Sequence, residues 1–176
     1  MTLQCRNPFH VLLAILSLVS CSPFEKHVMA HKALLGEGLF NLEAASSDTS
    51  WRDSLRRVST DWLGVPYLWG GEGPDSIDCS GYMQKVFSEA MHVGLPRRAA
   101  WQALVGVPVE RFELKFGDLV FFSSDTEVDH VGMYWGEGWF INATVSRGVA
   151  FSHLEEPFWA GRYRIARRLV IPQRKE

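Results

Sequence analysis

The sequence lacks any apolar run long enough to cross a bilayer as a helix, which takes roughly 20 residues. Its N-terminal apolar run extends from Phe9 to Val19, with Arg6 before it and Ser20 and Cys21 after it. This layout is typical of an export signal. We therefore predict a signal peptide over residues 1–20 that is removed from the mature protein, and no permanent transmembrane segment.

Blocks of like charge are also missing, and the formal net charge is only -2 with 47% hydrophobic residues. This balance is ordinary for a soluble globular domain and gives no indication of nucleic-acid binding. A chain of 176 residues is long enough for one domain with a real core and too short for two comfortable ones. We see no internal repeat, and a monomer is expected.

The four residues at 18–21, LVSC, resemble the lipobox of bacterial lipoproteins, in which the signal is cut before a cysteine that receives lipid. This resemblance implies lipidation of Cys21 and a domain anchored on the periplasmic side of a bacterial membrane. An ordinary signal peptide, releasing a soluble periplasmic or secreted protein, is the alternative. Residues 21–50 are then a tether with an N-terminal extension, and residues 51–176 the folded domain.

Cysteine is scarce, which excludes a disulfide framework within the mature monomer. Cys5 leaves with the signal and Cys21 becomes the anchor, so Cys79 remains alone. A solitary thiol in an oxidising compartment is at risk of oxidation, and its presence calls for deep burial or for a use.

Hydrophobic periodicity divides the domain into a helical first half and a strand-rich second half. A helix is predicted over Trp51 to Trp62, and a stronger one begins at or just before Cys79 and continues to about Gly94. Short strand-like runs follow, with a hairpin turn at 136–138. The predicted strands are Leu119–Phe122, His130–Trp135, Trp139–Thr144, Val149–His153 and Tyr163–Ile171. The fold class is therefore α+β, with helices packed against an antiparallel sheet.

The placement of Cys79 suggests nucleophilic chemistry. A thiol attacks a carbonyl as thiolate, and the unpaired N–H groups and dipole of a helix N-terminus stabilise that anion. A nearby histidine would serve as base. His130 and His153 are both on the sheet, and His130 is favoured because it opens a strand, where its side chain can project toward the helix start. The residues alone leave both open.

Four motifs together resemble the NlpC family of cell-wall cysteine peptidases, over Trp51 to Arg168. They are GVPYLWGG at 64–71, DCSG at 78–81, GDLVFF at 117–122 and HVGMY at 130–134. The resemblance implies a papain-like α+β fold with Cys79 as nucleophile and His130 as general base. The third family position is usually a second histidine, and Asn142 stands there. An amide oxygen can accept the second ring N–H of His130, although losing the histidine could also mark an inactive relative.

The resemblance also assigns residues around the nucleophile. Tyr67 matches a tyrosine whose hydroxyl can reach the substrate or the oxyanion, and Asp78 and Ser80 match positions that contact the amine end of the peptide stem. Asp78 is in addition a candidate helix cap, and the two roles are compatible. Arg97 or Arg98 could hold a substrate carboxylate, or form a solvated basic turn.

The implied reaction is hydrolysis of an amide bond in the peptide stem of peptidoglycan or of a muropeptide. The bond between γ-linked D-glutamate and a diamino acid is the typical one in this family. No metal or organic cofactor is expected. The alternatives are a non-catalytic lipoprotein that binds muropeptides or a partner enzyme, and a Cys–His amidase or acyltransferase acting on another substrate.

Overall fold

The computed structural model describes residues 50–169. The predicted signal peptide, Cys21 and most of the tether lie outside the described residues. Within residues 50–169 no helix has the length and apolar character needed to cross a membrane. Of the predicted folded domain, residues 51–169 are described and residues 170–176 lie outside the described residues.

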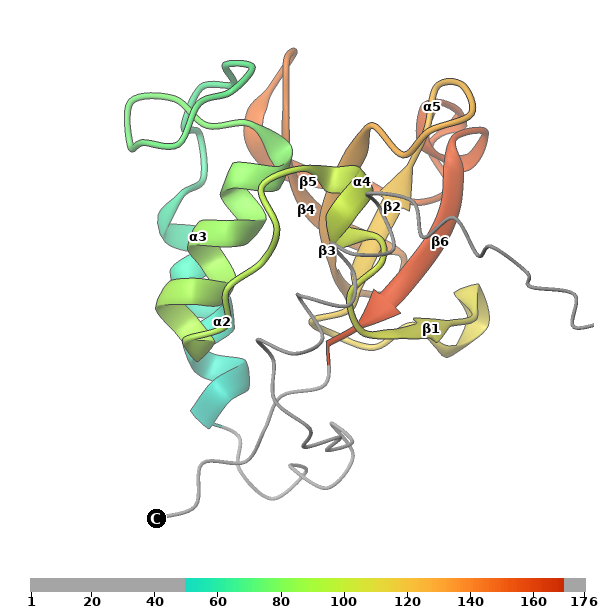
Figure 1. The fold of residues 1–176 in the computed structure, drawn as a ribbon, viewed down its shortest axis with the longest axis horizontal. Helices are drawn as coiled ribbons and strands as arrows, with labels where there is room; N and C mark the ends of the chain where they lie inside the picture. The colour runs from blue at the N-terminus through green and yellow to red at the C-terminus, as the bar shows by residue number, and fades with distance from the viewer. Residues whose placement is uncertain (1–49, 170–176) are drawn as a thin grey trace, which may run out of the picture.

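The two main helices lie close to where the hydrophobic periodicity places them. α2 buries Leu55 and Val58 on one side, and α3 buries a longer apolar face that includes Tyr82 and Phe87. The two helices pack against each other (Figure 1). The helices are α2 (Ser50–Asp61), α3 (Cys79–Met91), α4 (Ala99–Gln102) and α5 (Pro157–Ala160), with a 3-10 turn η1 (Arg111–Glu113).

The strands form one sheet in the order β1-β6-β2-β3-β4-β5, with every neighbouring pair antiparallel. The strands are β1 (Val107–Val109), β2 (Leu119–Phe122), β3 (His130–Gly136), β4 (Trp139–Thr144), β5 (Gly148–His153) and β6 (Tyr163–Arg168). The predicted α+β class with an antiparallel sheet is confirmed. The last strand ends at Arg168, three residues earlier than predicted, and β1 was not predicted at all.

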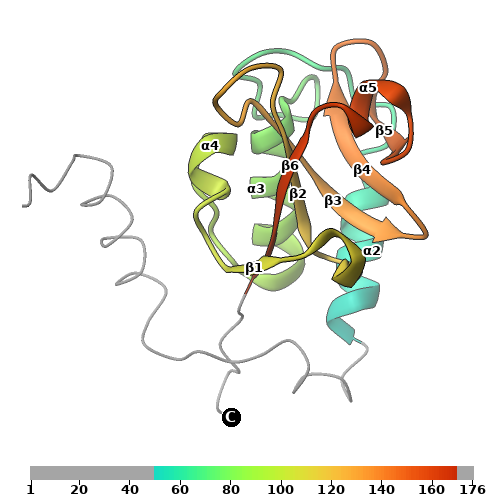
Figure 2. The same cartoon turned by 90° about the vertical axis from the view of Figure 1, so that its right-hand side faces the viewer.

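The sheet is covered on both faces, which explains why β2 reads as an unbroken apolar run. Leu119 and Phe121 belong to the core between the sheet and the helices α2 and α3, whereas Val120 and Phe122 belong to a second cluster under α5. Successive side chains of a strand point to opposite faces. Figures 1 and 2 show α3 on one side of the sheet and α5 beyond the other.

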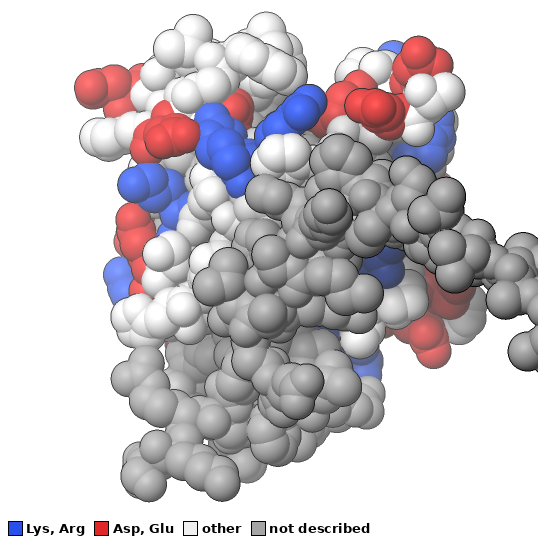
Figure 3. All heavy atoms as spheres, in the orientation of Figure 1, with Lys and Arg blue, Asp and Glu red and all other residues white. Residues whose placement is uncertain are grey.

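Charged side chains of both signs are interspersed on the surface. On the face seen in Figure 3, basic and acidic residues alternate over the described elements. This distribution agrees with the small net charge of the whole sequence. The chemistry of the domain therefore has to be sought in a local site.

Candidate active site

The site begins where α3 begins, because Cys79 is the first residue of that helix and Asp78 is its N-cap. The Asp78 carboxylate accepts a 2.7 Å hydrogen bond from the Gly81 N–H, which satisfies one of the unpaired donors of the first turn. Gly81 is required here, because a Cβ would lie 2.8 Å from the carbonyl oxygen of Gly71. The predicted capping role of Asp78 is thus confirmed.

The Cys79 thiol is packed against the start of β3. Its Sγ lies 4.0 Å from the carbonyl oxygen of Asp129, and the Val131 N–H stabilises its thiolate form. These two backbone groups belong to the residues on either side of His130. The thiol therefore lies against the backbone on either side of His130, fifty residues away along the chain.

The His130 ring is held by an amide. Its Nε2 lies 3.1 Å from Oδ1 of Asn142 on β4, a residue with no exposed surface. The amide nitrogen donates to Ser152 Oγ at 2.9 Å and toward the Ala150 carbonyl oxygen at 3.4 Å. Because Ser152 and Ala150 offer acceptors to the amide nitrogen of Asn142, the amide oxygen is the atom that faces the His130 ring. Nε2 then carries the proton, and Nδ1 is the basic nitrogen.

Arg147 extends this network to the surface. Its Nη2 donates a 2.7 Å hydrogen bond to the same Ser152 Oγ that receives the Asn142 amide. The fully buried Ser152 hydroxyl thus accepts two hydrogen bonds, one from Asn142 and one from Arg147. No sequence pattern indicated this set of contacts, because it depends on the pairing of β4 with β5.

Burial decides the charge state of the pair. It raises the pKa of the Cys79 thiol to about 11, although the N–H groups of Val131, Ser80 and Cys79 itself act in the opposite direction. It lowers the pKa of His130 to about 4, against the raising effects of the Asn142 hydrogen bond and the Asp129 charge. Both shifts favour the uncharged forms, a neutral thiol and a neutral imidazole. Burial thus acts against the expected thiolate, because desolvation shifts the pKa of the thiol more than the N–H groups of the helix start do.

Tyr67 lies beside the thiol, as the motif comparison implied. Burial, followed by the nearby Cys79 and Asp78 charges, raises the pKa of its hydroxyl to about 12. The group is therefore a phenol at any physiological pH and can donate a hydrogen bond. A donor next to the nucleophile suits an oxygen that gains negative charge.

Arg97 is committed to the protein. Its Nη1 and Nη2 form a fork on the Asp78 carboxylate at 2.9 and 2.6 Å, and its Nε reaches Glu72 at 2.5 Å. Burial alone would raise the pKa of Asp78, but hydrogen bonds from Arg97, Gly81 and Ser80 hold it below its usual value. The suggestion that Arg97 holds a substrate carboxylate is therefore not supported. The role of Asp78 and Ser80 toward an ammonium group stays a prediction.

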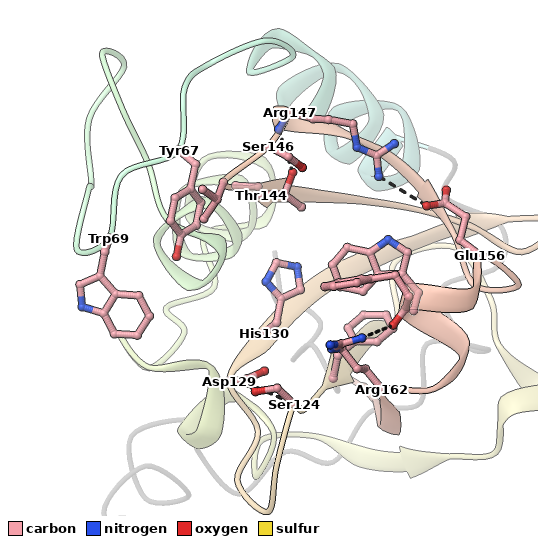
Figure 4. Close-up of a pocket in the computed structure, with 15 residues that line it drawn as sticks. Tyr67, Trp69, Ser124, Asp129, His130, Thr144, Ser146, Arg147, Glu156 and Arg162 are labelled. Carbon is pink, nitrogen blue, oxygen red and sulfur yellow. Dashed lines mark hydrogen bonds and ion pairs between the residues drawn. The ribbon is translucent and has the colours of Figure 1, made fainter.

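A cleft of about 650 Å³ opens over His130. Tyr67 and Trp69 lie at one end of it, and Arg147, Glu156 and Arg162 lie toward the other (Figure 4). Between them the Trp159 ring packs on the imidazole at 5.0 Å and 30°. Tyr67 and His130 were predicted, but the lining residues on and around α5 were not, because α5 is a single turn with no periodic pattern to reveal it.

His153, the competing base, is held elsewhere. Its Nε2 lies 3.0 Å from the Glu137 carbonyl oxygen, and its ring packs on Trp139 at the far end of the β4–β5 pairing. It does not line the cleft. Residues 50–169 contain no group of three or more metal-binding side chains of the His, Cys, Asp and Glu types.

Comparisons with known proteins identify the family and several relatives of this chain. The model of the NlpC/P60 family matches residues 64–168. The murein DD-endopeptidase MepS/murein LD-carboxypeptidase of Escherichia coli K12 is 33% identical over 172 residues, which cover 93% of this chain and 90% of that protein. The gamma-DL-glutamyl hydrolase of Bacillus subtilis is 42% identical over 118 residues, which cover 64% of this chain and 29% of that protein.

Among solved structures, an NlpC/P60 family protein from Bacillus cereus superposes with a TM-score of 0.63 at 34% identity. The match covers 67% of this chain and 40% of that one, so this chain spans about two fifths of that protein. A lipoprotein-like member of the family from Staphylococcus aureus gives a TM-score of 0.65 at 31% identity, covering 72% of this chain and 43% of that one.

Proposed function

The chain belongs to the NlpC/P60 family of papain-like cell-wall cysteine peptidases, and we propose that it hydrolyses the bond between γ-linked D-glutamate and a diamino acid in peptidoglycan stem peptides. The relatives named as a murein endopeptidase and as a gamma-DL-glutamyl hydrolase support a peptidoglycan substrate. The choice of bond rests on the resemblance to the family.

The observation that carries the proposal is the junction of α3 with β3. It combines a buried thiol at a helix start with a neutral imidazole whose Nε2 is fixed by Asn142. An imidazole held in this tautomer offers Nδ1 as a general base. A neutral histidine beside a neutral thiol is the starting state for proton transfer from sulfur to nitrogen.

The reaction then proceeds in two halves. His130 takes the thiol proton as Cys79 attacks the amide carbon, and the C–O electron pair moves onto the oxygen. Backbone N–H groups at the start of α3, together with the Tyr67 hydroxyl, would stabilise that oxyanion. The imidazolium gives its proton to the departing amine, which leaves a thioester. Water, deprotonated by His130, attacks the thioester and releases the acid and the free thiol.

We also propose that the mature chain begins at a lipidated Cys21 and is held as a monomer at the periplasmic side of a bacterial membrane, with residues 21–50 as tether. The motif LVSC at 18–21 supports this placement. A lipid anchor would keep the cleft near the cell wall without a transmembrane helix.

The direct test is digestion of purified peptidoglycan. The wild type should release fragments with a new N-terminal diamino acid, identified by mass, and Cys79→Ala should release none. His153→Ala is the matched control, because that histidine lies outside the cleft, and it should retain full activity. Equal product from wild type and Cys79→Ala would refute the nucleophile. Fragments ending at a different bond would refute the proposed specificity alone.

A further inference from the structure

The half of the cleft beyond His130 carries two opposite charges. Arg147 lies in the turn between β4 and β5, and Glu156 is the residue just before α5. Both line the cleft, on the other side of His130 from Tyr67 (Figure 4). Neither takes part in the proton transfers proposed above, although Arg147 also donates to Ser152 in the network that holds Asn142.

This ion pair is poorly satisfied. The Arg147 Nη2 lies 3.6 Å from the Glu156 carboxylate, longer than a good charge-assisted hydrogen bond, and the side chains are 44% and 39% exposed. Nη2 also donates to Ser152, and Glu156 accepts from the His153 N–H at 2.9 Å. Nη1 and Nε of Arg147 make no hydrogen bond within residues 50–169. Donors of one charge and acceptors of the other therefore remain available at the cleft.

We propose that Arg147 and Glu156 form a subsite for the zwitterionic end of the diamino acid on the leaving side of the cut bond. The inference rests on the proposed function. A free amino-acid end carries a carboxylate and an ammonium group on one carbon. The guanidinium fork matches the carboxylate, and the Glu156 carboxylate matches the ammonium.

The polarity of the cleft supports this placement. The predicted contacts of the acyl part, Tyr67, Asp78 and Ser80, lie at or near the start of α3, and Tyr67 lines the opposite end of the cleft. A substrate whose carbonyl carbon reaches Cys79 must extend its departing amine, with the side chain attached to it, away from that end. The turn before β5 and the start of α5 are the elements that border this direction.

The test uses four synthetic peptides, L-Ala-γ-D-Glu-X, that differ only in X. When X is meso-diaminopimelate, its side chain ends in both an ammonium group and a carboxylate. Lysine keeps only the ammonium group and 2-aminopimelate keeps only the carboxylate. Norleucine has neither group. The wild type should prefer diaminopimelate over lysine by about tenfold in kcat/KM, the scale of a partly exposed charge-assisted hydrogen bond. The wild type should also prefer diaminopimelate over 2-aminopimelate by roughly fivefold in kcat/KM, because Glu156 binds the ammonium group.

Arg147→Gln should remove the preference for diaminopimelate over lysine, measured as a ratio of kcat/KM values within the variant, because glutamine carries no charge but can still donate to Ser152. Glu156→Gln should remove only the preference over 2-aminopimelate. Arg164→Gln, an exposed residue of β6 outside the cleft, is the matched control and should alter none of the ratios. The subsite is refuted if wild type shows no preference, or if Arg147→Gln slows all four peptides equally, which would make Arg147 only a support of Ser152.

Failure of the proposed bond specificity gives a different result. If the wild type cuts none of the peptides, that specificity is wrong, and the dissociation constants of the Cys79→Ala variant then test the subsite directly. Tighter binding of the diaminopimelate peptide than of the lysine peptide, lost on adding Arg147→Gln, supports the subsite. Equal binding of both refutes it.

Discussion

Replacing Asn142 tests the central claim about the site, that the amide fixes His130 as a base. Asn142→Ala leaves the Nε2–H of His130 without its acceptor in a buried position. An unsatisfied buried donor costs about 1–3 kcal/mol. If this cost destabilises the productive tautomer and orientation of the ring, kcat should drop by roughly 5- to 150-fold, because about 1.4 kcal/mol corresponds to a factor of ten in rate.

Two further substitutions separate orientation from charge. Asn142→His keeps a neutral acceptor for Nε2 and should retain most of the activity. Asn142→Asp adds a negative charge beside the imidazole, which favours the imidazolium and raises the pKa of His130 above its value of about 4. Because the protonated ring cannot act as base, the acid limb of kcat/KM should move to higher pH in this variant alone.

The assay is kcat and kcat/KM against pH on one stem peptide, with circular dichroism and thermal unfolding to show that each variant is folded. Equal kcat for the wild type, Asn142→His and Asn142→Ala would remove Asn142 from the site. An unshifted acid limb in Asn142→Asp would show that His130 is not the base that titrates.

Two other predictions follow from the burial and ion pairs of the site, and a third follows from the N-terminal motif. For the wild type, the acid limb of kcat/KM should lie well below pH 6.5, because burial lowers the pKa of His130. Because burial raises the pKa of Cys79, its alkylation by iodoacetamide should be slow at pH 7 and accelerate toward pH 11. Fast alkylation at pH 7 would indicate a stable thiolate. Arg97→Met should cost about 2 kcal/mol in urea unfolding at pH 7, because Asp78 loses its partner. Since the folded pKa of Asp78 is depressed, that cost should shrink as the pH falls below its usual value of 3.8, and a cost that is constant with pH would contradict the ion pair. Mass spectrometry of the mature protein should find diacylglycerol on an N-terminal Cys21, and an unmodified N-terminus at another residue would support release by an ordinary signal peptidase.

The sequence was sufficient for the elements that depend on local patterns. The helix after Cys79 begins where predicted, and two strands have the predicted bounds, because apolar periodicity and turn residues determine both. It was not sufficient for β1, whose three residues include Pro108 and depend on pairing with β6. It also failed for α5, a single turn held by the packing of Trp159 against Phe122.

The site shows the same division. Motifs predicted Cys79, His130 and Asn142 as site residues, and the structure places the thiol against the backbone beside His130 and the Asn142 amide against the His130 ring. The partners of Arg97 could not be assigned, since the ion pair with Asp78 joins residues nineteen positions apart, with α3 and the segment after it between them. The effect of burial on the pKa of the thiol could not be predicted either, because the depth of burial is a property of the assembled core.

An amide at the third position suits this particular site on electrostatic grounds. Burial makes charge costly at His130, and the Asp129 carboxylate already acts to raise the pKa of the ring. A carboxylate in place of Asn142 would add to that effect and bring the imidazole closer to being protonated before it can accept the thiol proton. A second histidine could present either an acceptor or a donor, depending on its tautomer. The Asn142 amide carries no charge, and Ser152 on the neighbouring strand fixes which of its ends faces the ring. The departure from the usual family residue is therefore compatible with a working general base.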